Sequence, residues 1–174
     1  MTEFRYDTYC GLYCGACEIM SLFKTAMDKG DKPRWEDLAP EMRKGIRAGR
    51  TDEIMCYGCK SDTLFIGCSK CLIRKCARNR MHVEACPQCG KFPCMRFRVF
   101  SLVMKLMQGR LPHVKSARAN RACIRNKGMA QWLSEQEAFW KCPACGKAFS
   151  WYAKICPSCG RDLDFQRRFS GRTV

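Results

Sequence analysis

Two pairs of cysteines near the C-terminal end constrain this chain more strongly than any other feature. They lie in Cys142-Pro143-Ala144-Cys145-Gly146 and Cys156-Pro157-Ser158-Cys159-Gly160, with ten residues between them. Two CxxC pairs at this separation bring four thiolates to one point, where a tetrahedral Zn²⁺ closes both loops at once. The glycine after each pair lets the backbone turn its amides towards the sulfurs. We therefore expect a zinc site formed by Cys142, Cys145, Cys156 and Cys159.

Cysteine accounts for 16 of the 174 residues, and nearly all of them lie in such short groups. The first residues include Glu3, Arg5 and Asp7 and lack the apolar segment of a secretory signal, and no apolar run approaches the length of a membrane span. In a reducing compartment, grouped cysteines serve as metal ligands rather than as disulfides. We therefore expect a cytoplasmic, metal-binding protein with no membrane association.

Eleven further cysteines form short groups between residues 10 and 94. The pairs Cys56/Cys59 and Cys68/Cys71 are eight residues apart and predict a second four-thiolate site, although each pair can instead share a metal with a more distant group. The remaining members are Cys10, Cys14, Cys17, Cys76, Cys86, Cys89 and Cys94. This set is one ligand short of two four-cysteine sites. Either His82 completes one of them, or His82 is an exposed loop residue and one site keeps an open position.

The spacing Cys10-x₃-Cys14-x₂-Cys17 matches the three-cysteine loop that holds a [4Fe–4S] cluster in radical SAM enzymes. Those enzymes need a long barrel of alternating strands and helices, and this chain shows no such alternation. A [4Fe–4S] cluster without that chemistry is the alternative to zinc in this loop.

Apolar residues at helical spacing predict a series of helices and a basic connector. The predicted helices cover residues 18–27, 33–48 (starting at Pro33 or Trp35), 72–80, 94–108, 112–127 and 128–140. The apolar stretch from Val99 to Met107 is expected to be buried. The expected fold class is small α+β, with short helices pinned by cysteine knuckles and a C-terminal β zinc ribbon. The expected division is a cysteine-rich domain (1–111), a basic helical connector (112–139), the ribbon (140–165) and a loose tail (166–174).

The formal net charge is +16, and no Asp or Glu occurs from Ala85 to Ser134. On the predicted 112–127 helix, Arg118, Arg121 and Arg125 share one face, which is suited to contacts with nucleic-acid phosphates. The alternative is a solvated face whose charge is partly balanced by metal-bound thiolates.

The order of the motifs CGLYCGAC, CYGCKSD, GCSKCLIRKCA and ACPQCGKFPC resembles a family of uncharacterised cysteine-rich proteins of anaerobic bacteria and archaea. Many members are similar at the C-terminal end, with Ile124-Arg125, Gly128 and Trp132-Leu133 preceding a zinc ribbon. The resemblance covers residues 8–160 and implies a metal-binding fold without an established activity. Cys123 lies outside the pattern and is expected to be a spare buried thiol.

These features favour a protein that binds several zinc ions and acts as a binding or adaptor module for a protein or nucleic-acid partner. The alternative is an iron–sulfur redox protein or small metalloenzyme with a cluster in the Cys10–Cys17 loop. No catalytic triad or carboxylate pair can be argued from the residues, so a role other than catalysis is preferred and enzymatic activity stays open.

Overall fold

The computed structural model describes residues 3–45, 54–164 and 169. The expected end of the second helix at 46–48 and nearly all of the expected C-terminal tail lie outside these ranges. None of the helices in the described part is both long and apolar enough to cross a membrane.

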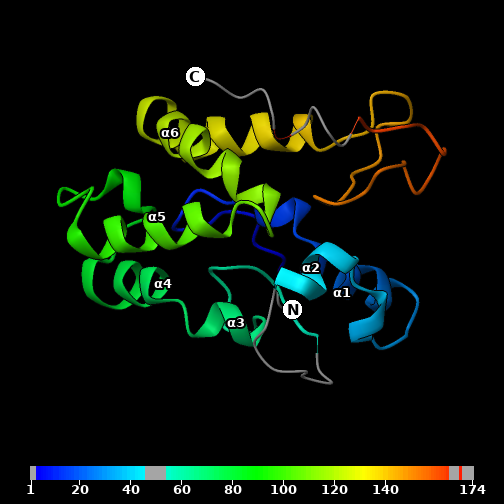
Figure 1. Ribbon diagram of the computed structural model, residues 1–174, viewed down its shortest axis with the longest axis horizontal. Helices are drawn as coiled ribbons and strands as arrows, with labels where there is room; N and C mark the ends of the chain where they lie inside the picture. Colours follow the sequence, from blue (N-terminus) through cyan, green and yellow to red (C-terminus); the bar gives the residue numbers. More distant parts are fainter. Residues whose placement is uncertain (1–2, 46–53, 165–168, 170–174) are drawn as a thin grey trace.

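Short helices joined by cysteine-bearing loops make up most of the described chain (Figure 1). The α-helices are α1 (Glu18–Asp28), α2 (Pro40–Gly45), α3 (Ile66–Ser69), α4 (Leu72–Cys76), α5 (Met95–Met107) and α6 (Ala117–Phe139). Short 3₁₀ or π-helical turns lie at η1 (Cys14–Ala16), η2 (Trp35–Asp37), η3 (Ala77–Met81), η4 (Cys86–Gln88) and η5 (Pro112–Ser116). Because α2, α3 and α4 are one or two turns long, none of them would be stable alone in water.

Most of the predicted helices are present, with one clear correction. The helices predicted at 18–27 and 94–108 correspond to α1 and α5. The single helix expected from Pro33 or Trp35 is wrong, because the chain forms the separate turns η2 and α2. Pro40 opens α2 and disfavours a helical conformation at the preceding residue, which accounts for the interruption.

Gly128 divides α6 into two helical segments, as the sequence predicts. Its backbone has φ of 86° and ψ of 172°, a conformation outside the helical region that glycine tolerates. In a straight helix, twelve residues span about 18 Å. The Cys123 thiol nevertheless donates to Glu135 Oε2 over 3.3 Å, so the second segment folds back beside the first.

The expected α+β class and the C-terminal β zinc ribbon are wrong. Over residues 141–163, here called the C-terminal knuckles, the structure has two isolated antiparallel bridges, Lys141 with Ala148 and Ile155 with Asp162, and the described residues form no sheet. The first bridge closes a hairpin that contains Cys142 and Cys145, and the second closes a hairpin that contains Cys156 and Cys159. Between the hairpins, Trp151 and Tyr152 turn into the core instead of extending as strands. The described fold is therefore mainly helical.

A second correction concerns α5. The sequence predicts that Val99–Met107 is buried, but Val99, Leu102 and Leu106 are 57%, 59% and 78% exposed. The helix packs through its opposite side, where Phe97 is buried. Periodicity alone identified the apolar face of this helix but could not show that this face is exposed.

Two hydrophobic cores hold the helices together. In the larger core, Trp132 is fully buried and meets the edge of Tyr13, and the same core includes Trp151 and Tyr152 of the C-terminal knuckles. The smaller core contains Tyr9, Ile73, Ala77 and Phe97, and several cysteine side chains pack against it. The N-terminal loops, α6 and the C-terminal knuckles thus share one apolar interior.

His113 in η5 ties the C-terminal knuckles to the body of the protein. Its ring stacks on Trp151 with centroids 3.8 Å apart, and its Nδ1 shares a 2.6 Å hydrogen bond with the Tyr152 hydroxyl. The Trp151 amide also donates to the Ala16 carbonyl over 2.8 Å. Burial lowers the pKa of His113 from 6.5 to about 3, so the packed imidazole is neutral.

This histidine should make stability depend on pH. The folded-state pKa lies below the unfolded value, so the unfolded chain takes up the extra proton and stability falls as the pH drops below 6.5. Between about pH 7.5 and about pH 5.5, wild type should lose about 1.4 kcal/mol more unfolding free energy than His113→Gln. Urea unfolding at both pH values measures the difference. Equal losses in wild type and His113→Gln would contradict the prediction.

Candidate metal centre

The C-terminal knuckles bring four cysteine sulfurs to one point. All four Sγ atoms of Cys142, Cys145, Cys156 and Cys159 lie within 4.8 Å of one another. The Cys142–Cys159 and Cys145–Cys156 sulfur pairs are 3.7 and 3.5 Å apart. Sulfurs placed tetrahedrally at ~2.3 Å from one ion are about 3.8 Å apart. The group therefore has the size of a site for a single metal ion, and no disulfide joins any of the described cysteines.

Backbone amides in the knuckles favour the thiolate form that a metal requires. The amides of Ala144 and Cys145 lower the pKa of Cys142. The amides of Cys159 and Ser158 lower the pKa of Cys156 to about 6. Gly146 and Gly160, which follow the two pairs, take φ values of 70° and 73°, a left-handed conformation that glycine adopts without strain. Cys142 and Cys156 are buried, whereas Cys145 and Cys159 face solvent.

The N-terminal segment is held against the loop that contains Cys56 and Cys59. The Arg5 amide donates to the Tyr57 carbonyl over 2.7 Å, and the Asp7 carboxylate pairs with Lys60 at 2.6 Å. Burial alone would raise the pKa of Asp7, but hydrogen bonds from Lys60 and Arg5 lower it below its usual value. Gly58, with φ of 114°, lets the two segments meet, since a Cβ there would collide with the Arg5 carbonyl.

This contact places the Cys10–Cys17 loop beside the Cys56/Cys59 pair. Burial raises the pKa of Cys14 well above its usual value, and the nearby charges of Cys59 and Cys17 raise it further. Burial likewise raises the pKa of Cys59 to about 12, with Cys10 adding to the shift. Cys56 and Cys71 act on Cys17 and Cys10 in the same way, and burial with the charge of Cys17 raises the pKa of Cys68. The two groups therefore intermingle, and their division into individual metal sites stays a prediction.

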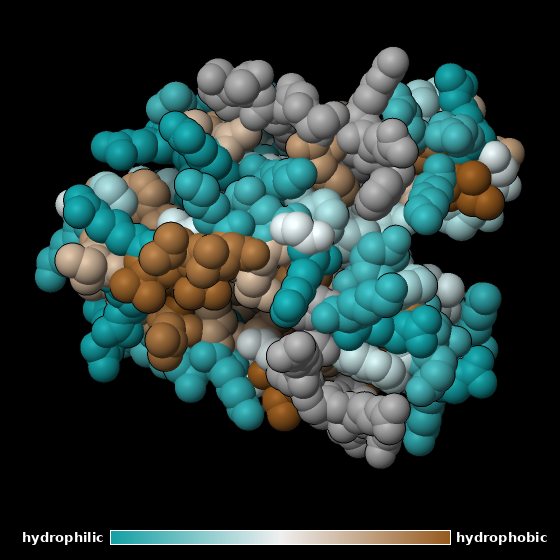
Figure 2. Space-filling view, in the orientation of Figure 1, coloured by the Kyte–Doolittle hydropathy of each residue, from teal (hydrophilic) through white to brown (hydrophobic). Residues whose placement is uncertain are grey.

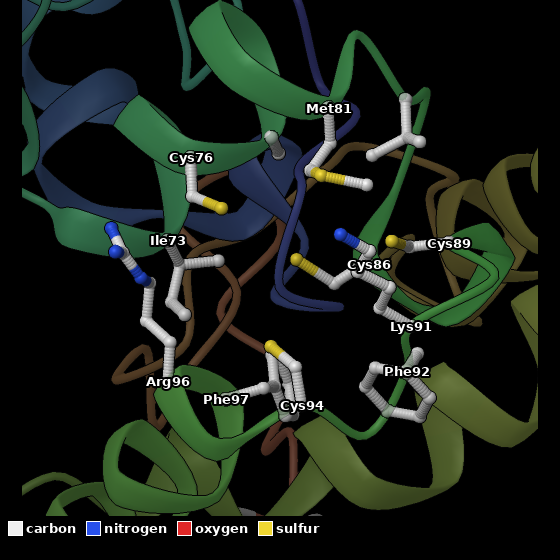
Figure 3. A pocket seen from close by; sticks show the side chains of 12 residues that line it. Ile73, Cys76, Met81, Cys86, Cys89, Lys91, Phe92, Cys94, Arg96 and Phe97 are labelled. Atoms are coloured by element: carbon white, nitrogen blue, oxygen red, sulfur yellow. The ribbon is translucent and has the colours of Figure 1, made fainter.

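Four other cysteines line one cavity of about 90 Å³. They are Cys76, Cys86, Cys89 and Cys94. In Figure 3 the sulfurs of Cys76, Cys86 and Cys94 point into this space from different sides. Burial, together with the charges of neighbouring thiols of which Cys10 is the first, raises the pKa of Cys86 to about 12. His82, the alternative eighth ligand, is exposed and is not among the lining residues.

Several of these cysteines occupy helix N-termini. Cys17, Cys71 and Cys94 are the N-cap residues of α1, α4 and α5, and none of the three makes a side-chain capping hydrogen bond within the described residues. The partial positive charge at a helix N-terminus stabilises an anion such as a thiolate. A helix N-terminus therefore lies next to each of these three sulfurs.

The three arginines predicted to contact phosphates lie along one groove of about 540 Å³ between α5 and α6. Arg118 and Arg125 are exposed, whereas Arg121 is half-buried over the Phe97 ring at 5.2 Å. Burial lowers the pKa of Arg121. Sequence reasoning missed Arg98 and Phe92, which line the same groove from the α5 side and from the loop before it. The lack of acidic residues over 85–134 indicated only that this region of the chain is basic.

The family model described as "Protein of unknown function (DUF3795)" matches residues 6–99. This chain belongs to the DUF3795 family. No curated protein matches it, and no solved structure matches it. The eleven cysteines from Cys10 to Cys94 lie within the DUF3795 region, so the predicted membership in an uncharacterised cysteine-rich family is confirmed for that part. The C-terminal knuckles lie outside it.

Loss of one sulfur in the C-terminal knuckles should remove one metal ion. Cys145 is exposed, so Cys145→Ser should change the site with little effect on packing. Native mass spectrometry after dialysis against a mild chelator is expected to show one ion fewer than in wild type. Cys123→Ser is the matched control, because Cys123 donates to Glu135 and does not belong to the four-cysteine group of the C-terminal knuckles, and it should retain every ion. An unchanged count in Cys145→Ser would contradict a metal role for this group.

Proposed function

We propose that this protein is a zinc-containing binding module that docks an acidic protein partner on the exposed face of α5. In this proposal, zinc at the C-terminal knuckles and metal at the cysteines of region 1–111 fix the fold, and residues 112–139 form a basic connector. The observation that carries the proposal is the apolar face of α5.

The sulfur geometry favours zinc at the C-terminal knuckles. Four thiolates at nearly tetrahedral separations suit Zn²⁺, which has no geometric preference of its own and is held in such closed sites for structural purposes. Carboxylate-binding ions such as Mg²⁺ or Ca²⁺ do not take thiolate ligands. Elemental analysis of the ion lost from Cys145→Ser is expected to identify zinc.

An apolar stripe runs along the outer side of α5. Met95, Val99, Leu102, Val103 and Leu106 recur at the spacing of one helix face, and their exposed fractions run from 48% to 78%. Figure 2 shows them as one brown area over α5. A contiguous exposed apolar area of this kind marks an interaction surface.

Basic residues border the stripe on both sides. By helical spacing, Arg96 lies along one edge, and Arg98 and Lys105 lie along the other; all three are exposed. No carboxylate occurs in the sequence between residues 85 and 134. The complement of an apolar stripe between two basic edges is an amphipathic segment with an apolar centre and acidic flanks.

A synthetic helix with leucines on one face and glutamates on the other is the probe for this surface. Leu102→Ser combined with Leu106→Ser should weaken its binding at least about tenfold, since each buried leucine contributes about 1.5 kcal/mol or more. Fluorescence anisotropy measures the affinity. Ile155→Ser, which changes an exposed apolar residue elsewhere, should bind like wild type.

Two results would overturn this assignment. Equal affinity of the double variant and wild type would show that α5 is not the docking surface. If the double substitution instead abolishes self-association without affecting probe binding, the occupant of the surface is a second copy of the chain.

The groove between α5 and α6 supports a second candidate function, the binding of single-stranded nucleic acid. Arg98, Arg118 and Arg125 line it, and no described ion pair engages any of them. Phe92, which is half-buried, lines the same groove and supplies aromatic surface. Cationic side chains beside aromatic rings are the combination that binds single strands.

Salt dependence tests this candidate. Arg121 packs on Phe97, so the variant to make is Arg118→Gln with Arg125→Gln, which leaves the core contact intact. On single-stranded DNA, each lost phosphate contact should flatten log K against log salt by about 0.7, or about 1.4 for the pair. Lys29→Gln with Lys32→Gln removes the same charge from an exposed turn after α1 and should leave the slope unchanged. Equal slopes for all three proteins would exclude the groove.

A further inference from the structure

The cavity lined by four cysteines differs in construction from the C-terminal knuckles. Its sulfurs come from separate parts of the chain: Cys76 ends α4, Cys86 opens η4, Cys89 follows η4, and Cys94 precedes α5. Figure 3 shows three of them directed into a common space and Cys89 beside Cys86. Cavity walls from α4, η3, η4 and α5 therefore place sulfurs around a volume rather than around a point.

The spacing of these sulfurs is too wide for one ion. Among the described residues, only the C-terminal knuckles bring four ligand atoms within 4.8 Å of one another. The cavity volume of about 90 Å³ is several times the ~10–15 Å³ that one water needs by the same kind of measure. A single zinc would leave much of it unfilled. A cube of four irons and four sulfides is larger, and its cysteine ligands stand correspondingly further apart.

The chemistry of the lining suits such a cluster. Ile73, Val83 and Phe97 give an apolar wall, and none of the lining residues is acidic or histidine. Apolar surroundings limit access of water to the sulfides. Lys91 and Arg96 lie at the margin and offset the net negative charge of four thiolates around a core of charge two plus.

We propose that Cys76, Cys86, Cys89 and Cys94 hold a [4Fe–4S] cluster in this cavity. The site adjoins the Cys10–Cys17 loop, the place that the sequence alone favours for a cluster, because the Cys86 amide donates to the Tyr9 carbonyl over 2.9 Å, but its four proposed ligands are other residues. The assignment depends on neither the zinc at the C-terminal knuckles nor the partner surface on α5.

Iron and acid-labile sulfide, measured on anaerobically purified full-length protein, test the assignment. Wild type should contain about four of each per chain. Cys94→Ser should lose most of both while keeping the zinc of the C-terminal knuckles. Cys123→Ser should keep both. Loss of iron in Cys17→Ser but not in Cys94→Ser would move the cluster to the N-terminal loop, and a sulfide-free wild type with additional zinc would overturn the proposal.

A measurement on the wild-type protein covers the case in which Cys94→Ser fails to fold. Anaerobic alkylation followed by peptide mass spectrometry compares the protein before and after oxidative removal of iron. The four cavity cysteines should be protected before removal and alkylated after it, whereas Cys142 and Cys156 should be protected in both states by zinc. Equal alkylation of the cavity cysteines in both states would contradict the proposal.

Discussion

Burial of many thiols between short helices is the constraint on which the rest of the structure depends. The helices α2, α3 and α4 are too short to be stable by themselves, and cysteines lie at or next to the ends of α3 and α4. Cys71 precedes α4 and Cys76 ends it, so both ends of one short helix carry a cysteine. Metal bonds at those positions would fix the ends of helices whose interiors contribute little stability.

The same arrangement explains where surface is left for other functions. The Asp7–Lys60 ion pair joins the N-terminal segment to the Cys56/Cys59 loop. Helix α5 packs on the body of the protein through Phe97, and Cys94 at its N-terminus packs against the same small core. Because α5 is fixed from one side and one end, its opposite face can stay apolar and exposed. The arginines of the α5–α6 groove lie next to this region, so the two candidate surfaces are neighbours.

Local signals in the sequence predicted the features that depend on nearby residues. The periodicity of residues 18–27 predicted α1, Gly128 predicted the break in α6, and the two C-terminal pairs predicted a four-sulfur group. Features set by distant contacts were not predictable in this way. The strands expected in the C-terminal knuckles are absent because Trp151 and Tyr152 pack against His113 and Ala16, far away in the sequence. Nothing in the spacing of Cys76, Cys86 and Cys94 showed that they would surround one cavity.

Amide hydrogen exchange before and after metal removal tests most directly whether metal–thiolate bonds hold this fold together. The protein should be prepared without oxygen, stripped of metal, and checked by elemental analysis before exchange. We expect protection to be lost together in α1, α4 and α5, because the ends of all three carry cysteines that would no longer be fixed. Protection that persists in these helices after complete metal removal would show that apolar packing alone maintains the fold, and would contradict this account.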